Sequence, residues 1–196
     1  MTYREILESE LRAFQFDLDP AQKSTLATYC EELSRWNKKI NLTGLTGAAL
    51  VRRLVVEPAW IGLQLKPQGI LLDIGSGNGS PAIPLRVVSP FGQCHLVEAR
   101  TRRAAFLRHL ATGLRLPNVE IHHARFEDVA PSIASPDWVT LQAVALTPEL
   151  MSSIQDISHT TTTVVWMTSS FVELFGLQPS GSLSVPITGT KVFLFG

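Results

Sequence analysis

The chain has 196 residues, 45% of them hydrophobic, and its 17 basic and 17 acidic side chains cancel. That length suffices for one domain with a full core, while no apolar run reaches the ~18 residues of a membrane span and the first five residues lack a secretory signal pattern. Cys30 and Cys94 lack metal-ligand spacing, which favours free thiols in a reducing compartment, so we expect a cytoplasmic protein without membrane contact.

Three helices are expected in the first part of the chain. Apolar residues at helical spacing predict helices over 3–15 and 20–39, the second opened by Asp19 as N-cap and Pro20 in its first turn. Asn41 lies in the segment that breaks the second helix, and a third helix is expected over 47–64. We expect residues 1–65 to form a helical extension packed on a core of residues 66–196.

Strands and helices alternate from residue 69 onward, which predicts an α/β fold with a mainly parallel sheet and helices on both faces. The expected strands are 69–73, 93–97, 118–122, 137–142 and 162–167, and the expected helices are 80–89, 101–114, 147–156 and 169–176. Segments 182–187 and 190–195 are expected to close the sheet as a hairpin around Thr188 and Gly189.

A glycine-spaced turn directly follows the first expected strand. Gly75, Gly77 and Gly79 come just after Asp73, and a helix can begin near residue 80. In a doubly wound α/β sheet this order of strand, glycine turn and helix brings backbone N–H groups up to a nucleotide-like ligand. The spacing fits neither the dinucleotide pattern G-x-G-x-x-G nor the Walker pattern.

Two carboxylates are expected at neighbouring strand ends. Asp73 ends the first strand, and Glu98 ends the next one about 20 residues after the turn, where an acid can accept hydrogen bonds from ribose hydroxyls. Asp73 would repel a pyrophosphate and attract an ammonium group. S-adenosylmethionine has a cationic methionine end and a neutral ribose, so the pair favours it as the cofactor. The alternative is a helix N-cap acid and an ordinary surface glutamate.

Positive charge is concentrated in the middle of the chain. Residues 35–125 hold thirteen basic and four acidic side chains, whereas the segments before and after them are net negative. Such a concentration suggests binding to a phosphate backbone, with a solvated helix face as the alternative.

The chain resembles the glucose-inhibited division protein B family, bacterial enzymes that methylate N7 of a guanine in small-subunit ribosomal RNA with S-adenosylmethionine as donor. Four segments carry the resemblance, which covers roughly residues 30–130: Trp36–Thr43, Asp73–Leu85, Val97–Leu107 and Asn118–Glu127. It implies a Rossmann-like class I S-adenosylmethionine-dependent methyltransferase fold and, as partner, ribosomal RNA or the small ribosomal subunit.

The resemblance also implies site residues. Those expected to bind the cofactor are Asp73, Gly75, Ser76, Gly77, Gly79, Ser80, Glu98, Phe126, Glu127 and Gln142, with Glu98 on the ribose and the backbone of Phe126 and Glu127 flanking the adenine. Those expected near the target base or RNA are Asn41, Arg125 and Gln142. For Asn41 the alternative is capping the second helix, and for Arg125 it is a salt bridge to Glu127 or Asp128.

Several positions depart from the family pattern. Gln142 stands where the family usually has arginine, and Thr168 stands where it usually has lysine. Arg52-Arg53 replaces an Arg-His pair, and Val56 replaces an acid. Two alternatives therefore stay open: a relative that binds cofactor or RNA without methylating, and a small-molecule methyltransferase. RNA action predicts an open cleft bordered by basic residues, namely Arg52, Arg53, Arg100 and Arg125, whereas a small-molecule enzyme predicts a closed, neutral pocket.

Methyl transfer to N7 needs no general base, because that nitrogen carries no proton at neutral pH. The five histidines (His95, His109, His122, His123 and His159) are therefore interpreted as surface or core residues without ligand-like partners. We expect no metal site and a monomeric protein.

Overall fold

The computed structural model describes residues 1–133, 135–168 and 178–196, and its centre is a seven-stranded sheet. The strand order is β3-β2-β1-β4-β5-β7-β6. The strands are β1 (Gly69–Ile74), β2 (Phe91–Val97), β3 (Val119–His122), β4 (Trp138–Gln142), β5 (Thr163–Thr168), β6 (Gly181–Ser184) and β7 (Lys191–Phe195). β1 to β5 pair in parallel, and β7 runs antiparallel to β5 and β6. The mainly parallel sheet and its closing hairpin are thus confirmed.

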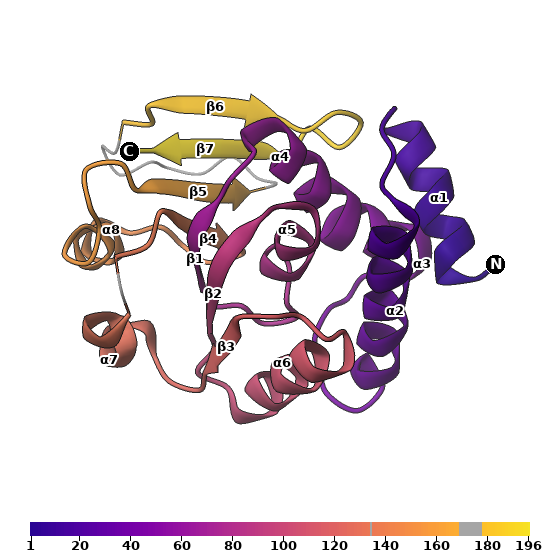
Figure 1. The fold of residues 1–196 in the computed structure, drawn as a ribbon, viewed down its shortest axis with the longest axis horizontal. Coiled ribbons are helices and arrows are strands. Elements are labelled where there is room, and N and C mark those ends of the chain that lie inside the picture. The colour runs from indigo at the N-terminus through magenta and orange to yellow at the C-terminus, as the bar shows by residue number, and fades with distance from the viewer. Residues whose placement is uncertain (134, 169–177) are drawn as a thin grey trace.

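Helices cover both faces of this sheet (Figure 1). They are α1 (Tyr3–Ala13), α2 (Pro20–Asn37), α3 (Gly47–Val51), α4 (Glu57–Leu65), α5 (Ala82–Val88), α6 (Thr101–Gly113), α7 (Phe126–Val129) and α8 (Pro148–Gln155). In Figure 1, α5 and α6 lie on one side with α2 beyond them, and α7 and α8 lie on the other. The helix expected over 169–176 lies outside the described residues.

The single α-helix expected over 47–64 is interrupted in the middle by a turn of another helix type. A π-helical turn, Arg52–Val56, joins α3 to α4. One extra residue per turn rotates the side chains that follow it, and such turns occur often at functional sites. The short helix α7 was not expected, because four residues are too few for a periodic pattern.

The start of α2 follows directly from its sequence. Asp19 accepts hydrogen bonds from the amides of Ala21 and Gln22 at 2.8 and 2.9 Å, and Pro20 occupies the first helical position. These contacts satisfy amides that have no partner within the helix. The predicted cap is confirmed.

Two apolar clusters hold the layers together. One includes Leu7, Tyr29, Leu71 and Phe106, so the N-terminal helices share a core with the sheet and α6. The other lies on the opposite face of the sheet and includes Leu72, which alternates with Leu71 along β1. The division at residues 65/66 stays a prediction.

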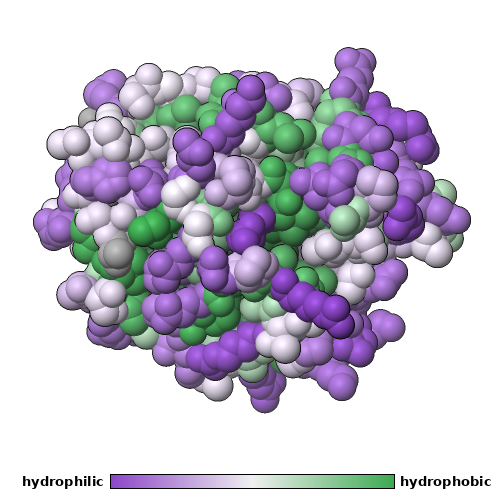
Figure 2. All heavy atoms as spheres, viewed as in Figure 1, coloured by the Kyte–Doolittle hydropathy of each residue, from purple (hydrophilic) through white to green (hydrophobic). Residues whose placement is uncertain are grey.

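Trp36 contributes to the packing of α2. Its ring lies 5.5 Å from that of Phe106 and 5.2 Å from that of His109, both on α6. The side chain therefore packs α2 of the helical extension against α6. Figure 2 shows polar residues over much of the viewed face, with apolar residues visible between them. None of the helices in the described part of the chain has the length and apolar content needed to cross a membrane.

The strand order decides where a ligand can bind. The chain moves from β1 to β2 on one side, and β4 pairs with the other side of β1. The direction of winding therefore reverses at β1, and open α/β sheets bind ligands beyond the carboxyl ends of the strands at such a point. The turn after β1 and the loop after β4 meet there.

Candidate functional site

A cavity of about 660 Å³ lies at this switch point. Residues from three segments distant in sequence line it: Leu42, Thr43 and Leu45 after α2; Gly75, Ser76, Gly77, Asn78 and Ser80 after β1; and residues 142–145 at the end of β4. The remaining lining residues are Arg53, Leu54, Arg103, Trp166, Met167, Thr168 and Thr190. Its size suits a cofactor or a nucleotide.

The glycine turn brings bare backbone to the cavity. Gly75 has φ +73°, and a Cβ there would lie 2.7 Å from Cγ2 of Val144 on the opposite loop. Gly77 has φ +51° and its amide donates to Glu98. Both backbone conformations favour glycine, so the turn keeps this wall free of side chains.

Asp73 lies beneath the turn and is 1% exposed. Its Oδ1 accepts a hydrogen bond from the Thr140 hydroxyl at 2.6 Å, while its Oδ2 is buried without a hydrogen-bond partner among the described residues. Burial raises the pKa of this carboxyl to about 6, and its hydrogen bonds offset only part of that rise. An unpartnered buried oxygen next to the turn fits a ligand with an ammonium group.

Glu98 follows β2 and is 6% exposed. Its Oε2 accepts from the Gly77 amide at 2.9 Å and its Oε1 accepts from the Arg100 amide at 2.7 Å. The carboxylate therefore links the glycine turn that follows β1 to the segment that follows β2. A carboxylate has about four lone-pair sites, so two remain for ribose hydroxyls.

Asn37 orders the loop over the cavity. Its side-chain oxygen accepts from the amides of Leu42 and Thr43 at 2.8 and 3.0 Å, and its Nδ2 donates to the Thr43 carbonyl. Asn41, expected near the target base or as a cap of the second helix, is exposed, and its carbonyl accepts from Arg103 Nη2 at 3.1 Å. The loop and α6 thus meet at the cavity through the backbone of Asn41.

The two neighbouring arginines have different surroundings. Arg52 forms an ion pair with Glu10 of α1, with distances of 2.6 and 2.9 Å. Arg53 lines the cavity and donates to the Thr190 hydroxyl at 2.8 Å, which in turn donates to the buried Glu57 at 2.8 Å. Burial raises the pKa of Glu57. Only Arg53 of this pair belongs to the site.

The residues predicted from the sequence divide into two groups. Gly75, Ser76, Gly77, Ser80 and Gln142 line the cavity. Among the described residues, the predicted ones that do not line it are Asn41, Asp73, Gly79, Glu98, Arg125, Phe126 and Glu127.

Those outside the lining differ in their surroundings. Asp73 and Glu98 lie directly under the turn, whereas Phe126 is buried among apolar residues at the start of α7. Arg125 and Glu127 are exposed. Within the described ranges Arg125 makes no ion pair with Glu127 or Asp128, so that alternative is not observed.

Sequence reasoning missed several lining residues, notably Asn78 and Arg103. Asn78 stands inside the glycine motif and accepts, through its carbonyl, from the Tyr29 hydroxyl at 3.0 Å. Its position between two motif glycines was the available signal. Arg103 sits five residues after Glu98, in the first turn of α6, and its role depends on the register of that helix.

The prediction that the histidines lack ligand-like partners was wrong for His95 and His122. His95 and His122 lie within hydrogen-bond distance, with Nδ1 and Nε2 2.9 Å apart, and both are close to Glu120. His109 contacts Glu32 at 2.6 Å, and His159 lies 3.3 Å from Asp137. Pairing between strands brings together residues that no sequence spacing signals.

Two comparisons of the sequence with known proteins give the same result. The family model described as rRNA small subunit methyltransferase G matches residues 22–174. Ribosomal RNA small subunit methyltransferase G of Geotalea uraniireducens is 36% identical over 149 residues, covering 75% of this chain and 68% of that protein. The protein of the same name from a Geobacter species is 32% identical over 151 residues, covering 76% of this chain and 70% of that protein.

A solved structure supports the fold. The crystal structure of a mutant of MtNAS in complex with S-adenosylmethionine has a TM-score of 0.63 at 18% identity, covering 89% of this chain and 70% of that one. The likeness shows a shared fold, a mainly parallel sheet with helices on both faces. The glycine turn, the strand order and these matches show that the chain belongs to the rRNA small subunit methyltransferase G family, the glucose-inhibited division protein B family of the sequence resemblance.

Proposed function

We propose that this protein transfers a methyl group from S-adenosylmethionine to N7 of a guanine in small-subunit ribosomal RNA. The observation that carries the proposal is a single cavity whose lining includes both the backbone of the glycine turn and two arginines, Arg53 and Arg103. The first part suits a nucleoside cofactor and the second suits a nucleotide with a phosphate.

The residues around the turn fit the cofactor. The buried Oδ2 of Asp73 offers an acceptor for an ammonium group, and Glu98 has lone pairs left for ribose hydroxyls. Gly75 and Gly77 leave the space that a Cβ would fill. When bound, S-adenosylmethionine supplies an electrophilic methyl group on its sulfonium.

The chain's own part in catalysis is to orient and to stabilise charge. N7 has a free lone pair, so no residue has to remove a proton. Holding two reactants in line can supply up to ~7–11 kcal/mol of the barrier. Arg53 is held in place by Thr190 and Glu57, so it can meet the nucleotide without a large loss of side-chain entropy.

A second function is favoured by two neutral residues. Gln142 and Thr168 both line the cavity where the family usually carries cations. A chain with weaker charge there would bind the cofactor or RNA without transferring the methyl group. The two basic residues that remain in the lining favour transfer to RNA over a small-molecule substrate.

One experiment separates these functions. Small ribosomal subunits lacking the N7 methyl group are incubated with the protein and methyl-labelled S-adenosylmethionine, and label in the RNA is counted. We expect incorporation, with calorimetry showing cofactor binding by the same sample. Cofactor binding without incorporation supports the second function. We further propose that the protein acts in the cytoplasm as a monomer.

A further inference from the structure

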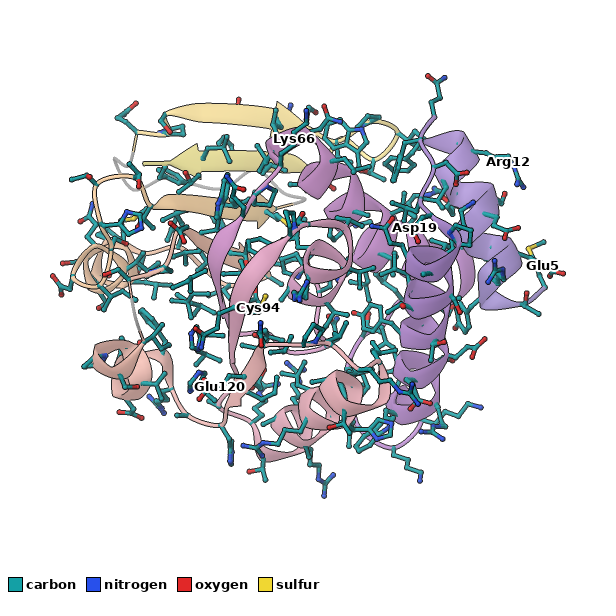
Figure 3. The ribbon with its side chains drawn as sticks, in the orientation of Figure 1. Glu5, Arg12, Asp19, Lys66, Cys94 and Glu120 are labelled. Atoms are coloured by element: carbon teal, nitrogen blue, oxygen red, sulfur yellow. The ribbon has the colours of Figure 1, made fainter. Side chains whose placement is uncertain are left out.

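Three metal-ligating side chains converge on one face of the sheet, away from the cavity. They are His95 on β2 and Glu120 and His122 on β3, here called the β2–β3 triad. β3 is the edge strand of the sheet, and Figure 3 labels Glu120 on it. In the parallel register His95 lies opposite Glu120, and His122 stands two residues further along β3. All three therefore point to the same face.

The ligand atoms face one another at distances that suit a single ion. Nδ1 of His95 lies 2.9 Å from Nε2 of His122. Oε2 of Glu120 lies 3.6 Å from Nδ1 of His95, and Oε1 of Glu120 lies 3.8 Å from Nε2 of His122. Two ligands at ~2.0–2.1 Å from a tetrahedral zinc ion are ~3.3 Å apart, so small side-chain movements would accommodate an ion between the three side chains.

Burial restricts how these side chains interact. His95 is 5% exposed, and its Nε2 has no hydrogen-bond partner among the described residues, so Nδ1 is the atom through which the ring bonds. The Glu120 side chain is 58% exposed, which leaves a side of the triad open to water. Three protein ligands plus water is a common coordination set for zinc.

We propose that the β2–β3 triad binds one divalent transition-metal ion of the zinc type. Two imidazoles and one carboxylate favour such ions over magnesium, which prefers oxygen ligands. The ion would join the edge strand to β2. His122 ends β3, and its carbonyl accepts from the Glu98 amide at 3.0 Å, so the ion would also fix the strand end that supports the cofactor carboxylate.

The test is titration of tag-free, metal-stripped full-length protein with Zn²⁺ by calorimetry, with Mg²⁺ as a second probe. We expect one Zn²⁺ per chain, a higher Tm and no heat with Mg²⁺. His122→Ala and Glu120→Gln are each expected to weaken Zn²⁺ binding by more than about tenfold. Loss of a residue that only hydrogen-bonds to a metal ligand already costs about tenfold or more, and loss of a ligand should cost at least as much.

The control is His123→Ala, which removes an exposed histidine next to the triad and should leave Zn²⁺ affinity unchanged. Glu120 is exposed, so its variant is expected to fold even if His122→Ala does not. Absence of Zn²⁺ binding by the wild type would overturn the proposal, as would equal affinities for the wild type and Glu120→Gln. Neither result bears on methyl transfer.

Discussion

The hydroxyl of Thr140 on β4 donates a hydrogen bond of 2.6 Å to Oδ1 of Asp73 on β1. The two residues are paired across the parallel strands, so the fold itself sets this contact. It satisfies one oxygen of a carboxylate whose other oxygen is buried without a partner in the described structure. The acid is thus positioned for a ligand at a cost in stability, as is common at functional sites.

Replacement of Asp73 by asparagine should stabilise the free protein at neutral pH. Burial raises the pKa of Asp73 from 3.8 to about 6, so the native state binds more protons than the unfolded state between these values. The contribution of this group to stability is therefore fully present below pH 3.8 and is lost as pH rises through 6. Asp73→Asn should gain on the order of 1–3 kcal/mol at pH 7.5 and less at pH 4.5.

Urea unfolding at several pH values measures this difference. Asp156→Asn, at an exposed carboxylate, is the control and should show no comparable pH dependence. A gain for Asp73→Asn that is the same at pH 4.5 and pH 7.5 would contradict the assigned pKa. The variant should also lose affinity for S-adenosylmethionine in calorimetry, since the ammonium group would no longer meet a carboxylate.

Gly75→Ala should destabilise the protein and weaken cofactor binding. Its Cβ would lie 2.7 Å from Cγ2 of Val144, and φ of +73° is unfavourable for alanine by ~1–2 kcal/mol. Gly44→Ala is the matched control, because no atom lies within 4 Å of its Cβ. Calorimetry with S-adenosylmethionine and urea unfolding should show losses for the first variant only. Equal affinities would show that the turn does not contact the cofactor.

Local sequence signals predicted most of the fold. The cap at Asp19, the alternation of strands and helices from residue 69 and the glycine turn depend on neighbours in the chain, and the structure confirms each. The cavity-lining glycines followed from the same signals. The π-helical turn did not, since it changes the helix register without a distinctive residue.

Contacts across the sheet and between distant loops were not predictable in the same way. His95 and His122 are 27 residues apart, and only the register of β2 against β3 brings them together. Likewise Arg53 joins the site through Thr190, 137 residues later. A run of basic residues in the sequence indicates a charged surface, but it does not say that Arg53 faces the cavity while Arg52 faces Glu10.

Because Arg53 lines the cavity and Arg52 pairs with Glu10, substitution of Arg53 should affect methyl transfer and substitution of Arg52 should affect stability. Arg53→Gln should lower methyl transfer to ribosomal subunits by ~10- to 100-fold, the equivalent of one hydrogen bond from a charged group. Arg53→Lys should retain part of the rate because it keeps the charge. Arg52→Gln should lower stability through the loss of the Glu10 ion pair while leaving transfer unchanged. Equal losses of transfer in Arg52→Gln and Arg53→Gln would contradict the separation.

Gln142→Arg tests whether the neutral cavity wall limits the reaction. Gln142 is the last residue of β4 and lines the cavity, at the position where the family resemblance implies arginine. A guanidinium there would add a charge-assisted contact to a nucleotide phosphate, worth ~1.5 kcal/mol or about tenfold in rate. Initial rates of label transfer at saturating S-adenosylmethionine should rise by that factor. Gln142→Glu is the matched control and should lower the rate, because its charge repels the phosphate. A rate that is unchanged in both variants would place the RNA away from this wall.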